Sequence, residues 1–309
     1  MQFRQLEYFL AVAKEEHFAR AAEACYVSQP ALSVAIAKLE RELNVTLINR
    51  GHNYQGLTAE GERMAVWAKR ILAEQEAFKD ELAALRSGIT GTLRLGSEPT
   101  ASTTLVLPVA AFCAAHPQAR VQVHSRLSTT ELSRLLREFE LDAAIAHFAA
   151  ADLEGLQVTR LYTERYLLLV SEQLLPGTEP VTWADAARLP LALLGPTMRI
   201  RQVIDRAFDE SGVAVAPHLE TDSVASLCSM VAAGASATIL PHSWLQAMPA
   251  GVGTHAVPLI EPTTRVEVSV AVNAADPGSL TGRAFLNAAS RLGLGEFFDE
   301  TLPLEYHGS

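Results

Sequence analysis

Residues 18–33 carry the side chains whose types and spacing suggest the most specific chemistry in this sequence. Two short helical patterns meet there across a turn of about three residues, and Ser28, Gln29 and Pro30 open the second. In a helix-turn-helix, the N-terminal residues of the second helix face base edges in the major groove. Gln29 can read an adenine edge, Ser33 can touch a base or a phosphate, and Pro30 and Val34 can meet a thymine methyl group. The spacing therefore predicts a DNA-reading helix.

Plainer roles compete with DNA contact at several of these positions. Ser28 is a favoured N-cap residue, and capping alone accounts for it. Lys38 lies further along the same helix, where it contacts DNA or simply forms part of a solvated face. Residues 49–57 then read as a short hairpin-like loop in which Arg50 and His52 are candidates for contact with the backbone or the minor groove.

The elements that must position this helix are short and amphipathic. Apolar residues recur at helical spacing in residues 6–13, 18–25 and 32–43. A longer pattern, capped by Thr58, runs over residues 59–86 without a proline, and steps of four and three connect its apolar positions. These positions form a heptad series: Met64, Ala68, Ile71, Gln75, Phe78, Leu82 and Leu85. We interpret the series as a dimer seam; packing on its own domain is the alternative.

Residues 87–92 break the helix, and we place a domain boundary there. Beyond it, short apolar segments alternate with helical patterns, which is typical of an α/β domain with largely parallel sheets. The expected strands are 93–96, 121–127, 143–147, 167–171, 191–194, 237–240 and 266–272, and the expected helices are 103–115, 129–139, 200–211, 223–233 and 280–292. Two subdomains with a cleft between them fit this length.

Charge and composition exclude several classes of protein. The net charge is −10, but residues 1–90 carry 11 basic and 12 acidic side chains (net −1), so the acidity lies mostly in residues 91–309. Electrostatics therefore permits DNA binding without indicating it. The sequence shows no signal peptide and no run of about 18 apolar residues, and its 3 cysteines are widely spaced. We expect a cytoplasmic protein with no disulfide framework and no membrane association.

Catalytic and metal-binding signatures are missing from the sequence. It contains no G-x-S-x-G, G-x-x-x-x-G-K, G-x-G-x-x-G or H-E-x-x-H pattern, and no His-x-x-x-His or Cys-x-x-Cys spacing. We therefore expect no enzyme, no metal and no cofactor. A solute-binding protein would explain the C-terminal part but predicts a signal peptide and no DNA-binding head. A dimerisation scaffold would explain the heptads but not the helix-turn-helix.

Taken together, these motifs resemble the LysR-type transcriptional regulators. The resemblance spans the full chain and is carried by LEYF at 6–9, the helix-turn-helix at 18–33, LEREL at 39–43, LTAEG at 57–61, LVLP at 105–108, LDAAI at 141–145 and ILP at 239–241. It implies a winged helix-turn-helix, a dimerising linker helix and an effector domain similar to type 2 periplasmic binding proteins. Such regulators are usually homotetramers. Here Ser33 is followed by Val34 and Ala35, and the wing has few arginines, which implies fewer phosphate contacts.

Hydroxyl residues follow three expected strands, where ligands of open α/β sheets bind. The resemblance places the effector cleft at these segments, near His147 and Arg199. The candidates are Thr100, Ser102, Thr103, Ser128, Thr129, His147, Arg199 and Thr221. Hydroxyls, free backbone N–H groups and an arginine suit a small anion or organic acid. The alternatives are ordinary helix caps for each hydroxyl, a core or rim histidine, and a surface ion pair for Arg199.

The expected architecture is therefore multidomain: a winged helix-turn-helix over 1–58, a linker helix over 59–88, and an α/β effector domain over 92–300. The expected function is transcription regulation by an oligomer on operator DNA, switched by a small molecule. A dimer forms through the linker helix and joins a second dimer as a tetramer. RNA polymerase is the further expected partner. Cys113 and Cys228 read as small side chains within helices, and a redox switch would need them close together.

Overall fold

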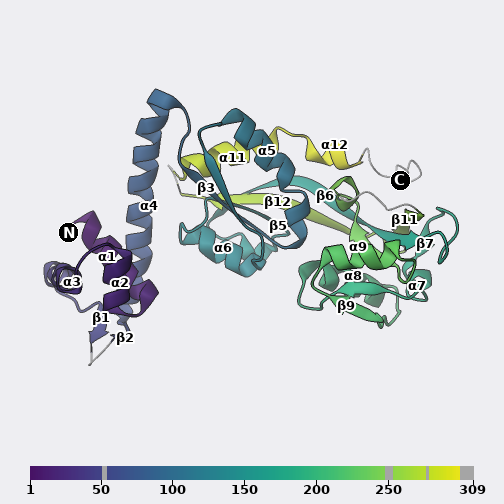
Figure 1. Ribbon diagram of the computed structural model, residues 1–309, viewed down its shortest axis with the longest axis horizontal. Coiled ribbons are helices and arrows are strands. Elements are labelled where there is room, and N and C mark those ends of the chain that lie inside the picture. The colour runs from purple at the N-terminus through teal and green to yellow at the C-terminus, as the bar shows by residue number, and fades with distance from the viewer. Residues whose placement is uncertain (51–53, 248–252, 276–277, 300–309) are drawn as a thin grey trace.

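The computed structural model describes residues 1–50, 54–247, 253–275 and 278–299 (Figure 1). The N-terminal domain consists of three helices and a two-stranded hairpin: α1 (Phe3–Glu15), α2 (Phe18–Ala24), α3 (Gln29–Leu43), β1 (Ile48–Arg50) and β2 (Tyr54–Leu57). Its core is apolar and includes Leu6, Phe9, Leu32, Ile36 and Leu39, all fully buried. Packing of these amphipathic faces therefore fixes how the three helices cross.

Local signals set the ends of α3. The Ser28 hydroxyl accepts a hydrogen bond from the backbone N–H of Ala31 at 3.4 Å, which satisfies one free donor of the first turn. Pro30 occupies the first turn, where its missing N–H leaves no bond unmade. The helix ends at Asn44, which takes the left-handed conformation common at C-termini. These signals present the start of α3 at the domain surface.

A single long helix, α4 (Ala59–Ser87), leaves the N-terminal domain and reaches the C-terminal one (Figure 1). Thr58 caps it by accepting a hydrogen bond from the backbone N–H of Gly61 at 2.9 Å. A Cβ at Gly61 would collide with the carbonyl oxygen of Leu47, so only glycine lets the helix start this close to the hairpin. The helix ends at Gly88, whose φ of 78° suits glycine.

The heptad series on α4 divides into two parts with different partners. Met64, Ala68 and Ile71 pack against the N-terminal core, so the own-domain alternative holds for this first part. Phe78 and Leu85 are 61% and 81% exposed, and Leu82 is also exposed. The seam available to a second chain is therefore shorter than the heptads predicted. The reason is that the N-terminal domain packs on the first turns of α4.

The C-terminal domain alternates strands with helices. Its elements are β3 (Thr92–Ser97), η1 (Thr100–Thr103), α5 (Val106–Ala115), β4 (Arg120–His124), α6 (Thr129–Arg137), β5 (Ala143–Ala146), η2 (Ala150–Asp152), β6 (Leu156–Ser171), β7 (Val181–Thr182), α7 (Trp183–Ala186), β8 (Ala192–Leu194), α8 (Arg199–Glu210), β9 (Leu219–Thr221), α9 (Val224–Ala232), β10 (Thr238–Pro241), α10 (Trp244–Ala247), β11 (Thr254–Ile260), β12 (Arg265–Asn273), α11 (Leu280–Ser290) and α12 (Leu294–Asp299). This is the expected α/β class.

Strand β6 joins two subdomains with separate cores. In the first, α5, α11 and α12 cover one face of the sheet and α6 covers the other. The second core lies on β8, β10 and β11 with α7, α8 and α9. Strand order in the main sheet is β4-β3-β5-β12-β6-β11-β7, with β10 also paired to β6. Figure 1 shows the two subdomains side by side along β6.

The sheet is more mixed than the sequence predicted. The pairs β3–β4, β3–β5, β8–β9 and β7–β11 are parallel. However, β6 is 16 residues long and pairs antiparallel with β12, β10 and β11. The expectation of largely parallel sheets, with a strand only over 167–171, was therefore wrong at β6. Its first half is partly exposed and lacks the continuous apolar run that marked the second half.

Candidate DNA-binding surface and effector site

The start of α3 forms an exposed surface on the N-terminal domain. Gln29 and Pro30 are exposed, Val34 is 64% exposed and Ser33 is half-buried. Leu32 and Ile36 alternate with them and lie in the core. The structure thus brings Gln29, Pro30, Ser33 and Val34 onto one face, while Ser28 at its edge caps the helix.

Tyr26 is a candidate that the sequence reasoning missed. It lies in the turn between α2 and α3, is 95% exposed and has a φ of 55°. A bulky residue with positive φ is unusual. Tyr26 precedes the first residue of α3 by three positions, and its exposed phenol hydroxyl is a candidate for contact with a phosphate. Its place in a predicted turn, next to the predicted reading helix, was the signal available in the sequence.

The remaining predicted DNA contacts are less well defined. Lys38 is exposed, and its Nζ is 4.0 Å from a Glu42 carboxylate oxygen, so this weak pair leaves the ammonium accessible. Arg50 is the last residue of β1, but its side chain lies outside the described part of the chain. His52 also lies outside it.

Apolar side chains continue along an exposed face of α4. Trp67, Phe78, Leu82 and Leu85 follow each other at helical spacing, and all four are exposed. We call these four residues the linker stripe. Exposed apolar surface of this extent on a helix is typical of an interface with another chain.

At the end of β3, Thr100 belongs to η1 and is almost fully buried. Its hydroxyl has no hydrogen-bond partner among the described residues, although its carbonyl accepts a bond from the Trp244 Nε1–H at 3.0 Å. Thr103 donates its hydroxyl to the same carbonyl at 3.4 Å. Ser102 is in η1, but its side chain lies outside the described residues. The orphaned hydroxyl of Thr100 therefore distinguishes it from an ordinary cap.

His147 lies in a buried cluster between the two subdomains. It is 3% exposed; its Nδ1 is 2.8 Å from a Glu98 carboxylate oxygen and its Nε2 is 2.8 Å from one of Glu164. The second Glu164 oxygen accepts the Ser243 hydroxyl at 3.0 Å. We call Glu98, His147 and Glu164 the junction triad. Both ring nitrogens are engaged, so neither is free to meet a ligand directly.

The charge state of the junction triad follows from its carboxylates. Burial alone would lower the pKa of His147, but Glu164 and Glu98 outweigh it and raise the pKa to about 10. The imidazole is therefore protonated at neutral pH and pairs with both carboxylates. Each partner is a charge that would be costly to bury alone.

Tyr166 lies two residues after Glu164 on β6 and is fully buried. Its hydroxyl has no partner among the described residues. Burial raises the pKa of Tyr166 well above its ordinary value, Glu164 and Glu98 raise it further, and Arg199 opposes them. Arg199 is the first residue of α8, is partly exposed, and forms no ion pair within the described ranges. An unpaired cation and an unpaired buried hydroxyl thus lie in the same neighbourhood.

The other predicted hydroxyls have local roles. Ser128 forms a capping box with Glu131 at the start of α6. Thr129 is partly buried in the first turn of that helix. The Thr221 hydroxyl accepts the backbone N–H of Ser223 at 3.1 Å. The cap interpretation therefore accounts for Ser128 and for a turn at Thr221, and Thr100 remains the hydroxyl with unused bonding capacity.

The cysteines and possible metal ligands are dispersed. Burial raises the pKa values of the Cys25 and Cys228 thiols, and Cys113 is exposed on α5. Within the described ranges, no group of three or more His, Cys, Asp or Glu side chains is arranged to hold a metal ion. Nor does any helix there have the length and apolar character needed to cross a membrane.

Two family models match this chain. The model for bacterial regulatory helix-turn-helix proteins of the LysR family matches residues 3–62, and the LysR substrate binding domain matches residues 86–292. The second match alone covers more than half of the chain. The chain therefore belongs to the LysR family of transcriptional regulators, which confirms the resemblance seen in the sequence.

Individual relatives agree with this assignment. The chain is 35% identical over 246 residues to a probable hydrogen peroxide-inducible genes activator of Streptomyces viridosporus, with 78% of each covered. A full-length OxyR variant from Pseudomonas aeruginosa superposes with a TM-score of 0.74 at 23% identity, covering 96% of this chain and 97% of that one. CbnR in complex with its target DNA gives a TM-score of 0.62 at 24% identity, covering 94% and 99%. At these identities the two structures support the fold alone.

Proposed function

We propose that this LysR-family regulator binds operator DNA through α3 and is switched by a small anion or organic acid held between its two subdomains. The observation that carries the effector half is the buried Tyr166 hydroxyl, which has no partner among the described residues and lies within electrostatic reach of the unpaired Arg199. Thr100, at another strand end, has a second buried hydroxyl without a partner. Buried polar groups normally have partners, so a ligand that supplies them is the simplest explanation. No enzymatic step is assigned to the chain.

The DNA-reading half of the proposal uses the exposed face of α3. Gln29, Pro30, Ser33 and Val34 contact bases, with Ser28 at the edge of the face. Lys38 and Tyr26 contact the phosphate backbone, and Arg50 and His52 belong to the wing. The near-neutral N-terminal part implies few phosphate contacts, so the dependence of binding on salt should be shallow.

Oligomerisation sets the spacing of two reading helices. In the proposed dimer the linker stripe packs on its counterpart in a second chain, and effector domains join two dimers into a tetramer on adjacent half-sites. The linker stripe supports the proposed dimer, because its residues are exposed and three of the four belong to the second half of the heptad series. Contact with RNA polymerase completes the proposed set of partners.

The effector contacts combine charge with hydroxyl donors. Arg199 pairs with the carboxylate, aided by the free N–H groups at the N-terminus of α8, and Thr100 and Tyr166 donate hydroxyl bonds. Ser102, Thr103 and Thr129 are kept as further candidates from the sequence, whereas Ser128 and Thr221 are assigned to the cap and the turn that they form. His147 acts by holding Glu98 and Glu164 rather than by touching the ligand. Binding shifts regulation only if the ligand prefers one arrangement of the subdomains.

A gel-shift titration with the full chain tests both parts of the proposal, DNA binding and the effector response. The DNA immediately upstream of the gene should be retarded in preference to unrelated DNA of the same length. Val34→Asp should abolish that preference, because it puts a carboxylate against the bases. Arg199→Ala should leave operator affinity unchanged and remove the response to a panel of carboxylic acids. Equal binding of unrelated DNA by the unaltered chain would contradict the DNA half, and an unchanged acid response in Arg199→Ala would contradict the effector half.

A second candidate, peroxide sensing, is favoured by the name of the Streptomyces relative. Reaction with peroxide needs a thiolate, which a lowered pKa and good access promote. In this chain burial raises the pKa values of Cys25 and Cys228, which opposes the reaction. Counting free thiols after mild peroxide treatment decides between the two. Rapid loss of two thiols, together with altered operator binding, would support peroxide sensing instead of the anion.

A further inference from the structure

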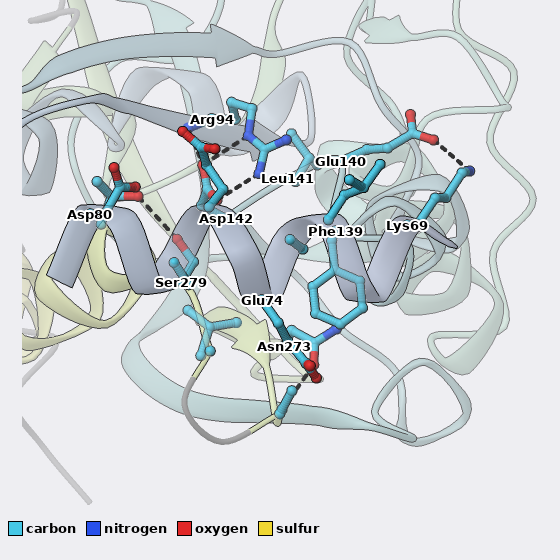
Figure 2. Close-up of a pocket in the computed structure, with 18 of the residues that line it drawn as sticks. Lys69, Glu74, Asp80, Arg94, Phe139, Glu140, Leu141, Asp142, Asn273 and Ser279 are labelled. Carbon is cyan, nitrogen blue, oxygen red and sulfur yellow. Dashed lines mark hydrogen bonds and ion pairs between the residues drawn. The ribbon is translucent and has the colours of Figure 1, made fainter. Parts of the chain in front are cut away.

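A cavity of about 580 Å³ lies where α4 meets the effector domain (Figure 2). One wall is α4; the others are residues 138–142 after α6, residues 91–94 at the start of β3, and described residues of 272–275 and 278–283. Thr100, Tyr166 and Arg199 do not line it. Its volume falls in the range of small-molecule sites, about 300–1,000 Å³.

Ion pairs close its rim and tie the two domains together. The Lys69 ammonium on α4 lies 2.6 Å from a Glu138 oxygen and 2.8 Å from one of Glu140. On the effector domain, Arg94 pairs with Asp142, with 2.8 Å between Nη2 and Oδ1. Figure 2 shows Lys69 at one end of the helical wall and Asp80 at the other. These pairs satisfy the rim carboxylates, so a ligand has no need to compete for them.

Two further ion pairs, Arg70 with Glu74 and Lys79 with Glu76, leave Asp80 as the one carboxylate of the lining without an ion pair among the described residues. It lines the cavity, is partly buried, and forms no salt bridge within the described part of the chain. Burial raises the pKa of Asp80, the neighbouring carboxylates of Glu76 and Asp142 raise it further, and Lys79 opposes them. The cavity lining includes six carboxylates and three cationic side chains: Glu74, Glu76, Asp80, Glu138, Glu140 and Asp142 against Lys69, Arg94 and Arg283. Because the other five carboxylates have ion-pair partners, Asp80 is the carboxylate left to meet an added positive charge.

The wall between these charged ends is apolar. Leu72, Ala73 and Ala77 of α4 line it, and Phe139 and Val272 come from the effector domain. Phe139 has a φ of 59°, unusual for a bulky side chain, and its ring is directed across the cavity (Figure 2). An aromatic or aliphatic body would therefore find contact on both sides.

The cavity does not compete with the proposed dimer contact. At 100° per residue, Lys69, Ala73, Glu76 and Asp80 lie on the side of α4 away from Phe78 and Leu85. A second chain packed on the linker stripe would leave this side of the helix facing its own effector domain.

We propose that this cavity is a second ligand site, for a small organic cation: an ammonium or amidinium group pairs with Asp80, and an apolar body lies between Ala73, Ala77 and Phe139. The site goes beyond the proposed function, since its ligand has the opposite charge and binds elsewhere. Because the ligand contacts both α4 and the effector domain, it favours one placement of the domain on the linker helix. It can therefore bias the same regulator independently of the anion.

Calorimetric titration of the full chain without DNA tests this site, with benzylammonium as the probe and benzoate as its counterpart of opposite charge. Benzylammonium should bind the unaltered chain. Asp80→Asn should weaken that binding at least tenfold, and Ala77→Phe, which fills the cavity, should abolish it. Glu81→Gln removes an exposed carboxylate from the next position of α4 and should change nothing; Arg199→Ala should also leave the amine unaffected.

Two results would overturn the site: no measurable binding of benzylammonium, or equal binding by Asp80→Asn and the unaltered chain. If Ala77→Phe fails to fold by circular dichroism, the isosteric Asp80→Asn decides alone. Benzoate binding that is lost in Arg199→Ala but kept in Asp80→Asn would belong to the proposed effector site. The titration therefore tests the proposed cation site and the proposed effector site independently of each other.

Discussion

The N-terminal domain and the subdomain junction bury very different side chains. The core of the first is apolar, and its one buried polar side chain within the described residues, Gln5, donates to the Ala35 carbonyl at 3.3 Å. The junction buries the triad of Glu98, His147 and Glu164 between two apolar cores. An apolar core keeps the N-terminal domain rigid, whereas a paired charge cluster is stable only while its partners stay in place. Movement between the subdomains would therefore disturb the junction triad far more than the N-terminal core.

The largest expected effect on stability comes from removing one carboxylate of the junction triad. Glu164→Gln leaves the protonated His147 with one carboxylate and should lower the free energy of unfolding by about 3 kcal/mol, measured by urea denaturation. Glu267→Gln on the neighbouring β12 is the matched control, because its pair with Arg160 is exposed on both sides. That control should change stability by less than about 0.5 kcal/mol. Equal effects of the two variants would contradict a buried charge cluster.

The pH dependence of stability should come from the junction. The pKa of His147 is raised from 6.5 to about 10, so protonation stabilises the folded state. This contribution is fully present below pH 6.5 and is lost as the pH rises through about 10. With roughly 1.4 kcal/mol per pKa unit, the free energy of unfolding should fall by a few kcal/mol across that window. Urea denaturation at several pH values measures it, and His147→Gln should flatten the slope.

Within the apolar N-terminal core, loss of a single methylene should have a smaller effect. Ile36→Val should lower the free energy of unfolding by about 1 kcal/mol, because Ile36 is fully buried and the cavity left behind relaxes only in part. The loss should be the same at pH 7 and pH 9, since no titratable group is among the fully buried residues of that core. Thermal unfolding at both pH values checks it. A loss of unfolding free energy that grows with pH would contradict the expected difference between the N-terminal core and the junction.

The smallest expected effect is on the candidate DNA-binding surface of α3. Lys38→Ala should change stability by less than about 0.5 kcal/mol, since its pair with Glu42 is long and exposed. If Lys38 contacts a phosphate, the slope of log affinity against log salt should become shallower by about 1. Gel shifts at several salt concentrations measure the slope. An unchanged slope would assign Lys38 to the solvated face.

Local chemistry made much of the N-terminal domain predictable. Ser28 and Pro30 mark a helix start, Thr58 marks another, and apolar residues at helical spacing define the inward faces of three helices. These signals act within a few residues of each other, so a single sequence contains them. The family resemblance likewise rested on such motifs, and the family models confirmed it.

The candidate effector site was less accessible to sequence reasoning. Thr100 and Arg199 were named from their places after a strand and before a helix, but Tyr166, Glu98 and Glu164 were not. Glu164 and Tyr166 lie on β6, where only the second half was recognised as a strand. Acidic residues in a sequence read as exposed by default, because burial of a charge needs a partner that local pattern does not reveal.

The sequence by itself determined the class of this protein, the order of its domains and the face of α3 turned toward solvent, because each depends on spacing within one element. Only the tertiary structure decided that the first heptads of α4 pack on the N-terminal domain, leaving Trp67, Phe78, Leu82 and Leu85 exposed. It alone brought Glu98, His147 and Glu164 together, and Lys69 against Glu138 and Glu140. The physical reason is that these contacts join residues far apart in the chain, and their energies depend on burial that no local spacing encodes.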